Sequence, residues 1–403
     1  MEHAIEQLQI LIIFLARAGM LLVHVNIIPS TDVNLITIQH ILSITVSTFC
    51  YLCFGYRLSL IKEISDFSFG WIIKSTDINL NEIIDGWRSM IFCEGLMSIS
   101  IAGRAHFATD LLVSLMVSSL IQPLMMNLIT NGTNLNSLGR SMFEFEDNTK
   151  TSVIHVLPAG FSFIASMIFG QRVVNIKQMD LSSVPINAHS ASFLGYLFVI
   201  AGFMMNNGII NNLFTVSTGM LTMLIILLPS KQDADYWSSV WILQGGLVAV
   251  ISNVSCFKPF ETIIVAVCTT IMYATMARLI RSSILEDYGN ILTIHGIAGS
   301  LPLVLQHLCQ NVNYHKALIG AIFGFTTFSI GIAVGIILLI PMKIFGILRS
   351  HSEEEVSNQN WSKIKHQTKK RGIQPGDHTI TKFKRFMDTE YGQGLHEGRM
   401  TEL

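Results

Sequence analysis

The sequence predicts an all-α membrane protein of about eleven transmembrane helices, followed by a polar C-terminal tail. Half of the 403 residues are apolar and only 13% are charged, whereas about 25% is usual for soluble domains. Apolar stretches of about 17–25 residues recur along the chain, each long enough to cross about 30 Å of hydrocarbon. More than a third of the charged residues lie in residues 343–403. These observations predict a transmembrane domain over residues 1–349 and a cytoplasmic tail over residues 350–403.

The predicted spans are helices because backbone groups in lipid must satisfy their own hydrogen bonds. The third span, around Met90–Gly103, and the break between the sixth and seventh, at Asn206–Gly208, have the weakest apolar signal. The expected centres are Phe14, Thr48, Met97, Val117, Phe161, Phe198, Met220, Val248, Val267, Gly299 and Gly331.

Two connections are expected to be long, over residues 58–87 and 130–150. The second contains the glycosylation sequon Asn131-Gly132-Thr133, a weak sign of an outside loop. Lys343 and Arg349 follow the last span, and basic residues at a helix end favour the cytoplasm. An odd number of spans then places the N-terminus outside, and we expect the plasma membrane.

Charge and cysteine content exclude other classes of protein. The net charge is −1, so nothing indicates nucleic-acid binding. Cys50 and Cys53 form a C-x-x-C pair within a predicted span, where packing is a better explanation than redox chemistry or metal binding. No cofactor and no metal site are expected.

Two acid–histidine units stand in matched settings. Asp147 is followed eight residues later by His155, and Asp287 eight residues later by His295. Each Asp lies at the start of a span, the fifth and the tenth, and each His about two turns inside it. Spans five apart enter the bilayer from opposite faces. Two inverted five-helix repeats plus one extra helix would bring the two histidines together near the midplane.

Each member of these units also has a structural explanation. An aspartate at a helix start is commonly an N-cap, and a membrane histidine often bonds helices together. The repeated spacing favours a functional pair, because ionisable residues inside spans are costly. Glu94 has the same two interpretations, a proton or cation site or a buried strut, and Arg17 either snorkels or pairs across helices.

Several short motifs resemble the ammonium transporter (Amt/Rh/methylammonium permease) family. The strongest run from Gln244-Gly245-Gly246 through Pro259-Phe260 to His295-Gly296-Ile297-Ala298-Gly299, and Phe169-Gly170-Gln171-Arg172 fits the end of the fifth span. The resemblance covers most of residues 8–350. It implies a trimer whose subunits each carry facing histidines in a narrow apolar pore, and no enzymatic activity.

By this resemblance His155 and His295 match the twin pore histidines. Asp147 matches the acid that supports the outer recruitment site, and Asp287 the acid at the start of the tenth helix. The family's Gly-Gly after the first acid falls on Lys150-Thr151. A lysine there is unfavourable beside a cation-recruiting mouth because the charges are alike.

The family's gate and vestibule residues are altered here. Without gaps, the third-helix phenylalanine positions fall on Asp85 and Ser89, and Phe92 is the nearest substitute. The second gate phenylalanine falls on Met205, and the serine that helps to hold the cation falls on Ile209. Separately, Pro158 is expected to kink the fifth helix at the pore.

The first functional hypothesis is a channel or transporter for ammonium or ammonia, with methylammonium as a further candidate substrate. A site that binds ammonium at the mouth, removes its proton and passes ammonia would reject potassium, which has no proton to lose. The second hypothesis is a non-transporting sensor or partner subunit of the same fold. A third, a different transporter or an intramembrane metal enzyme, is disfavoured because no metal-ligand spacing such as H-E-x-x-H is present.

Overall fold

The computed structural model describes residues 2–25, 33–59, 80–130, 147, 150–170, 188–204, 208–228, 236–253, 257–283, 285–311 and 313–349. The chain divides into two units, Met1–Ser350 and His351–Leu403. Every described residue belongs to the first unit. The boundary that the sequence predicts between residues 349 and 350 therefore stays a prediction, as does the nature of the tail.

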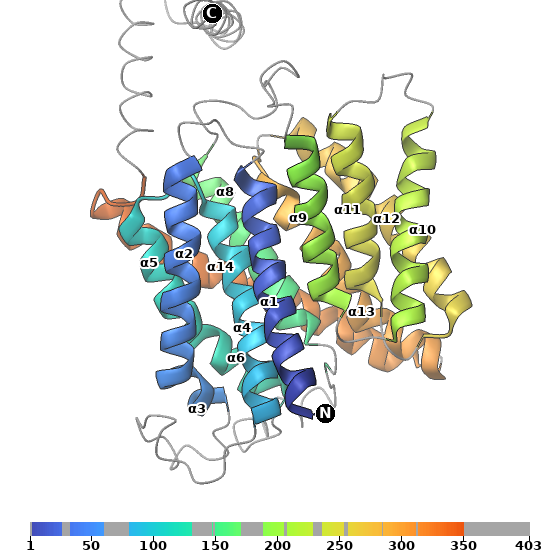
Figure 1. Ribbon diagram of the computed structural model, residues 1–403, viewed down its shortest axis with the longest axis horizontal. Helices are drawn as coiled ribbons and strands as arrows, with labels where there is room; N and C mark the ends of the chain where they lie inside the picture. The colour runs from blue at the N-terminus through green and yellow to red at the C-terminus, as the bar shows by residue number, and fades with distance from the viewer. Residues whose placement is uncertain are drawn as a thin grey trace, which may run out of the picture. The chain divides into compact units, whose positions relative to one another are not determined.

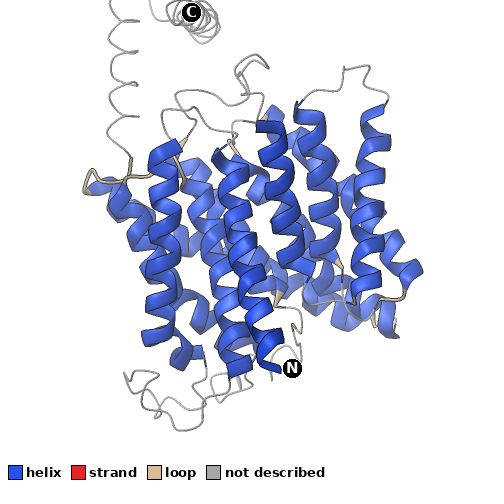
Figure 2. Ribbon diagram, viewed as in Figure 1, coloured by secondary structure: helices blue, strands red, loops and turns tan. Residues whose placement is uncertain are grey.

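Within the described residues the secondary structure is helical, apart from an isolated bridge between Ala105 and Arg349 (Figures 1 and 2). The helices form eleven rods, some of them built from two or three consecutive elements. The first five rods are α1 (Glu2–Val25); α2 (Val33–Cys50), η2 (Tyr51–Gly55) and α3 (Tyr56–Ser59); α4 (Leu80–Ile101); α5 (Phe107–Met116), η5 (Val117–Ile121) and α6 (Gln122–Thr130); and η6 (Ser152–Val156) with α8 (Leu157–Phe169). The other six are α9 (Ala188–Phe203), α10 (Ile209–Leu227), α11 (Tyr236–Ser252), α12 (Pro259–Ser282), η11 (Tyr288–Asn290) with α13 (Ile291–Asn311), and α14 (Tyr314–Ile344).

All eleven expected centres lie inside these rods, one in each. Eight of the described rods are long and apolar enough to cross a membrane, and α9 and α11 are apolar but shorter. The remaining rod, α4, carries Glu82, Asp85, Arg88 and Glu94. It begins at Leu80, so the expectation of a connection running to residue 87 was wrong. α4 is buried along most of its length, and Glu94 within it is fully buried, whereas Glu82 near its start is exposed.

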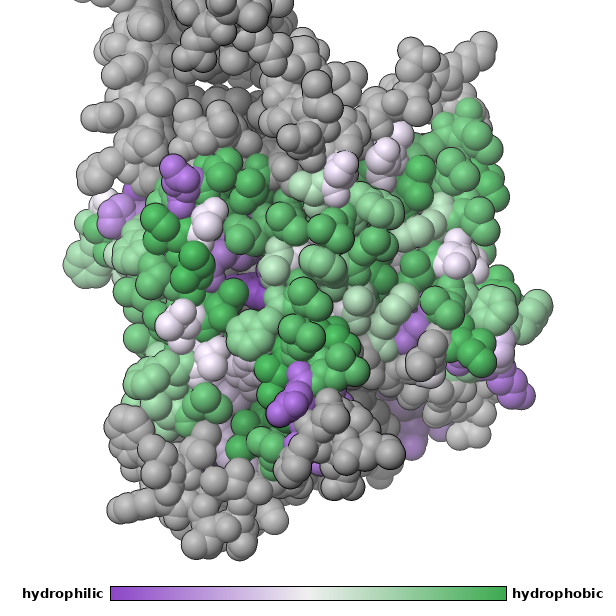
Figure 3. All heavy atoms as spheres, viewed as in Figure 1, coloured by the Kyte–Doolittle hydropathy of each residue, from purple (hydrophilic) through white to green (hydrophobic). Residues whose placement is uncertain are grey.

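The first and second sets of five rods are the two inverted repeats, and α14 is the extra helix. One contact between the repeats is that of α1 with α9. A Cβ atom on Gly19 would lie 2.5 Å from the carbonyl oxygen of Gly195, and one on Gly195 would lie 2.8 Å from that of Gly19. Among the described residues, apolar side chains cover most of the surface seen in Figure 3, as expected for a surface that faces lipid.

Three rods contain a wider π-helical turn, η2, η5 and η6. Pro123 and Pro158 each stand two positions after such a turn, and proline has no N–H to donate to the preceding turn. In η6 the N–H of Leu157 bonds the carbonyl of Ser152, which is the longer reach of a π turn. The fifth rod thus changes its helical geometry beside Pro158, where the sequence predicts a kink.

The segment after α14 returns to the turn between α4 and α5. The His106 N–H donates to the Leu348 carbonyl at 2.9 Å, and the Thr109 hydroxyl donates to the Ile347 carbonyl at 2.6 Å. Arg349 also donates to the carbonyl of Phe169, at the end of α8. A cation at a helix C-terminus is favourable for the helix dipole, so the last described residues are tied to the body.

Candidate functional site

His155 of η6 and His295 of α13 lie side by side in the interior. Their Nδ1 atoms are 2.9 Å apart, within hydrogen-bond distance, and their rings are within 13° of parallel with centroids 5.0 Å apart. Both residues are buried, at 4% and 2% exposure. In a neutral pair one Nδ1 donates and the other accepts, so one Nε2 carries a hydrogen and the other a lone pair. The two outer edges therefore offer one donor and one acceptor.

The close approach of the two rods depends on a glycine four residues after His295. A Cβ atom on Gly299 would lie 2.6 Å from the Cβ of His155 and 3.3 Å from the backbone nitrogen of Val156. Contacts that short do not occur without displacement, and here the neighbours include backbone. Gly299 thus lets α13 lie against η6, and the π turn of η6 presents His155 to it.

Asp147 fixes the start of the fifth rod. Its carboxylate accepts from the backbone N–H of Ser152 at 2.8 Å and from that of Thr151 at 3.3 Å, as well as from the Ser152 hydroxyl. Lys150, in the turn between, has a φ of 56°, in the left-handed region that L residues adopt only at a cost. Asp147 is buried, and its carboxylate caps the first N–H groups of the rod, which is one of the two interpretations that the sequence left open.

Asp287 fixes the start of the tenth rod with the same kind of hydrogen bonds. Its carboxylate accepts from the N–H groups of Leu292 and Thr293, both at 2.8 Å, and from the Thr293 hydroxyl. Asn290, three residues after Asp287 as Lys150 is after Asp147, also has a φ of 56°. The two acid–histidine units are therefore alike in backbone geometry as well as in spacing.

Two phenylalanine rings lie near the histidine pair, Phe203 at the C-terminal end of α9 and Phe92 in the middle of α4. The Phe203 ring stands edge-on to His155, with centroids 4.9 Å apart, and its centroid is 6.1 Å from that of His295. Phe92, which the sequence proposed as a gate substitute, packs on Phe203 at 4.8 Å. Sequence reasoning missed Phe203, although it is the last aromatic residue of the sixth span before Asn206-Asn207-Gly208.

The other two predicted mouth residues are not placed. Met205 lies outside the described residues. Ile209 begins α10, and its side chain lies outside the described residues as well. Both stay predictions.

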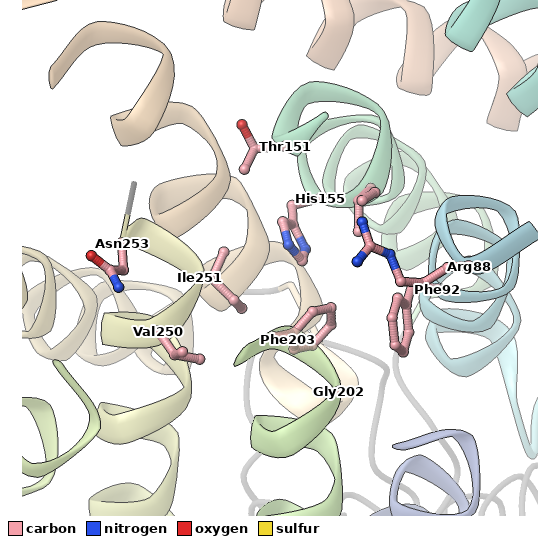
Figure 4. Close-up of a pocket in the computed structure, with 10 residues that line it drawn as sticks. Arg88, Phe92, Thr151, His155, Gly202, Phe203, Val250, Ile251 and Asn253 are labelled. Atoms are coloured by element: carbon pink, nitrogen blue, oxygen red, sulfur yellow. The ribbon is translucent and has the colours of Figure 1, made fainter. Parts of the chain in front are cut away.

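A cavity of about 30 Å³ adjoins His155, a volume that holds a water-sized molecule or two. Figure 4 shows the imidazole of His155 at its centre, the Phe203 ring next to it and the Arg88 guanidinium on the side of Phe92. The cavity is lined by Arg88, Phe92, Thr151, Ile154, His155, Gly202, Phe203, Val250, Ile251 and Asn253. Neither Asp147 nor Asp287 lines it.

A group of three charged side chains stands at this end of the site. The Asp85 carboxylate accepts from Arg88 at 2.8 Å through one oxygen and from Lys150 through the other. Arg88 is 12% exposed, Lys150 20% and Asp85 41%. Sequence reasoning noted Asp85 and Lys150 but missed Arg88. Arg88 precedes Phe92 by four residues and so shares its helix face, which is the signal that could have found it.

A second ion pair lies fully inside the first repeat. The Arg17 guanidinium bonds Glu94 at 2.8 Å, and the two side chains are 1% and 0% exposed. Ser114 donates to the other Glu94 oxygen at 2.8 Å. A Cβ on Gly95 would lie 1.6 Å from an Arg17 nitrogen, so the glycine makes room for the guanidinium. Glu94 is thus a buried strut, and Arg17 pairs across helices.

The second repeat carries a neutral network instead. Gln244 of α11 donates to the Tyr196 hydroxyl at 2.8 Å, and its oxygen accepts from Tyr273 and, at 3.0 Å, from Asn290. This network links α9, α11 and α12 to the start of the tenth rod. In the part of the chain that the structure describes, no three His, Cys, Asp or Glu side chains are grouped so as to hold a metal ion.

Comparison with known proteins places the fold and the family. The chain is 24% identical over 332 residues to the "Ammonium transporter Amt2" of Methanocaldococcus jannaschii, covering 71% of this chain and 75% of that protein. A solved "Sensor Amt Protein" matches with a TM-score of 0.74 at 15% identity, over 88% of this chain and 95% of that one. Candida albicans Mep2 matches with a TM-score of 0.68 at 14% identity, over 86% and 85% of the two chains.

The family model described as the Ammonium Transporter Family matches residues 5–369. This range includes both acid–histidine units and all eleven rods except the first three residues of α1. Together with the paired histidines from opposed repeats, the match identifies the chain as a member of the Ammonium Transporter Family.

Proposed function

We propose that this chain is a membrane channel or transporter that takes ammonium at one face, removes its proton and passes ammonia along an apolar path lined by His155 and His295. The single observation that carries the proposal is the 2.9 Å contact between the two buried Nδ1 atoms. It joins two rings that come from separate repeats, in surroundings provided largely by apolar side chains.

The proposal follows from the relative cost of the two species. A charged ammonium ion loses several kcal/mol or more of hydration energy in a dry passage, whereas ammonia is neutral and loses far less. The histidine pair offers one hydrogen-bond donor and one acceptor, which suit a molecule that both donates and accepts. Phe203 and Phe92 form the proposed gate above the pair, with Met205 and Ile209 as further predicted contributors at the mouth.

Asp147 and Asp287 serve this path indirectly. Each carboxylate accepts hydrogen bonds from N–H and hydroxyl groups at a helix start. We therefore assign each aspartate the role of orienting the rod that carries a pore histidine. This is a positioning role, since neither carboxylate borders the cavity.

The setting of the protein is proposed from the resemblance and the charge pattern. The N-terminus lies outside and the C-terminal tail, residues 350–403, in the cytoplasm. The protein resides in the plasma membrane as a homotrimer, with ammonium or ammonia, and methylammonium as an analogue, as its substrates. No enzymatic activity is proposed.

A second candidate function is a non-transporting ammonium sensor or partner subunit of the same fold. The charged group of Asp85, Arg88 and Lys150 favours it, because fixed cations beside the cavity oppose entry of another cation. The "Sensor Amt Protein" shows that a protein so described can have this fold. In this case the pore would bind without conducting, and the tail would carry the signal.

Uptake of methylammonium in a transport-deficient host separates the two candidates. We expect the wild type to take up substrate and His155→Ala and His295→Ala to change rate or selectivity at least severalfold. His315→Ala is the matched control, because His315 is an exposed histidine at the start of α14. A wild-type chain that reaches the cell surface and carries no substrate would reject transport in favour of the sensor.

A further inference from the structure

We propose that Gln244 is a positioning residue that couples the proposed gate to the histidine pair. One of its hydrogen bonds holds α9, which ends at Phe203, and another holds the start of the tenth rod, which carries His295. This inference rests on the proposed function, since it assumes that Phe203 and His295 border the path. It assigns a role in that path to a side chain that does not line the cavity beside His155.

The hydrogen bonds of Gln244 are the first support. Gln244 lies in the middle of α11 and is 1% exposed. Its amide nitrogen donates to the hydroxyl of Tyr196 at 2.8 Å. Its oxygen accepts from the hydroxyl of Tyr273 at 2.5 Å and from the amide of Asn290 at 3.0 Å, and so uses both of its lone pairs. One side chain of α11 thus connects α9, α12 and the start of the tenth rod.

The bond to Tyr196 acts on the helix that carries the gate. Tyr196 precedes Phe203 by seven residues on α9, so the two side chains share a helix face about two turns apart. The Phe203 ring stands edge-on to His155, with centroids 4.9 Å apart. Because a helix of this length moves as a rigid element, the position of Tyr196 determines the position of the Phe203 ring over the histidine pair.

The bond from Asn290 acts on the start of the tenth rod. Asn290 has a φ of 56°, which L residues adopt only at a cost, and its amide bond to Gln244 supports this conformation. Its N–H donates to the Asp287 carbonyl at 3.1 Å, so it belongs to the turn whose carboxylate caps the rod. His295 follows Asn290 by five residues. The orientation of this turn therefore determines the direction from which His295 approaches His155.

Gln244 can hold both elements because α11 itself is fixed against α10. A Cβ atom on Gly245 would lie 2.8 Å from the carbonyl oxygen of Gly219, and one on Gly219 would lie 2.4 Å from that of Gly245. The two backbones are thus in direct contact. Much of the surroundings is apolar, so breaking a bond of Gln244 leaves a buried polar group unpaired, which is costly. The network therefore favours one arrangement of the gate and the histidine pair.

Full-length protein reconstituted in vesicles tests the inference with two readouts. The first is the nitrogen NMR signals of the His155 and His295 rings in protein labelled with isotopic histidine. These signals report the contact between the two Nδ1 atoms whether or not the protein conducts. The second is the ratio of methylammonium uptake to ammonium uptake, which a mere loss of folded protein does not change.

The variants remove the bonds of Gln244 together or one at a time. Gln244→Leu removes all of them, and Gln244→Glu keeps the shape and an acceptor oxygen. Tyr196→Phe removes the bond to α9 alone, and Asn290→Gly, which keeps the backbone conformation, removes the bond to the tenth rod alone. Thr269→Val is the matched control. It removes a 3.1 Å contact with Ser252 that joins α11 to α12 and, among the described residues, neither α9 nor the tenth rod.

We expect Gln244→Leu to change the uptake ratio severalfold and to shift both histidine signals. Tyr196→Phe should change the ratio and leave the histidine signals close to those of the wild type, whereas Asn290→Gly should change both readouts. Gln244→Glu should stay closer to the wild type than Gln244→Leu. Adding Tyr196→Phe to Gln244→Leu should have little further effect, because the bond between the two residues is already lost. Thr269→Val should leave both readouts unchanged.

The other outcomes separate this inference from the proposed function. If the wild type transports and folded Gln244→Leu keeps the wild-type ratio and histidine signals, the role of Gln244 is overturned and the proposed function stands. If no variant and no wild-type protein transports but Gln244→Leu shifts the histidine signals, the proposed function fails and the positioning of His295 by Gln244 is supported. If Thr269→Val changes both readouts as much as Gln244→Leu does, the inference is overturned. Where Gln244→Leu does not fold, Tyr196→Phe and Asn290→Gly decide in the same way.

Discussion

The starts of the fifth and tenth rods share a backbone design but differ in charge. In both, an aspartate caps the rod and the residue three positions later has a φ of 56°. At the fifth rod that residue is Lys150, which pairs with Asp85. At the tenth it is Asn290, whose amide bonds Gln244. Two ends related by the inverted repeat thus present different surroundings to whatever passes between them.

The same contrast holds for the interiors of the two repeats. Among the described residues, the first repeat contains more buried charged side chains than the second. They are Arg17, Glu94, Arg104, Asp110 and Asp147 in the first repeat and Glu286 in the second. Repetition preserves the helix packing that places His155 against His295, while the electrostatics of each half has diverged.

The largest expected effect tests the charged interior of the first repeat. Arg17→Met should destabilise the protein by about 3–5 kcal/mol, because it leaves Glu94 buried without its counter-charge. Arg17→Met/Glu94→Met should recover most of that loss. Thermal unfolding in detergent gives the measurement. In the second repeat Gln244→Leu, which breaks the neutral network, should cost only about 1–3 kcal/mol. Equal losses for the two single variants would remove the contrast.

A smaller effect tests the shared capping design. Asp147→Ala and Asp287→Ala should each cost about 1–2 kcal/mol, since each removes the acceptor for two N–H groups at a helix start. Their asparagine variants, which keep one oxygen, should recover part of the loss. Hydrogen exchange at residues 151–155 and 291–295 should rise in the matching variant only. Loss at one rod without loss at the other would show that the caps are not equivalent.

The smallest effect compares the two left-handed residues. Asn290→Gly should cost about 1 kcal/mol, because asparagine tolerates this backbone conformation and its hydrogen bond to Gln244 is lost. Lys150→Gly should be within about 0.5 kcal/mol of the wild type, since relief of strain offsets the lost ion pair and the entropy of glycine. Lys150→Gln, which gains no relief, serves as the control and should be less stable than Lys150→Gly.

Sequence patterns predicted the fold because apolar length alone determines where helices can cross a bilayer. The histidine pair was predictable too, since two inverted repeats with equal Asp-to-His spacing would place both histidines at a similar depth near the midplane. Arg88 and Phe203 were missed for a physical reason. Which side chains border a cavity depends on the rotation of α4 and α9 about their helix axes, and this rotation cannot be read from the sequence pattern. The π turns were invisible because an extra residue in one turn leaves the apolar pattern nearly unchanged.

The crossing of α1 and α9 limits how the molecule can work. At Gly19 and Gly195 the backbones of the two repeats are in direct contact, with no side chain between the two glycines. A carrier that opens alternately to each side of the membrane would have to separate α1 from α9 in every cycle and expose their peptide groups to lipid. The contact between α1 and α9 instead favours a channel in which small side-chain rotations admit the substrate while the helices keep their positions.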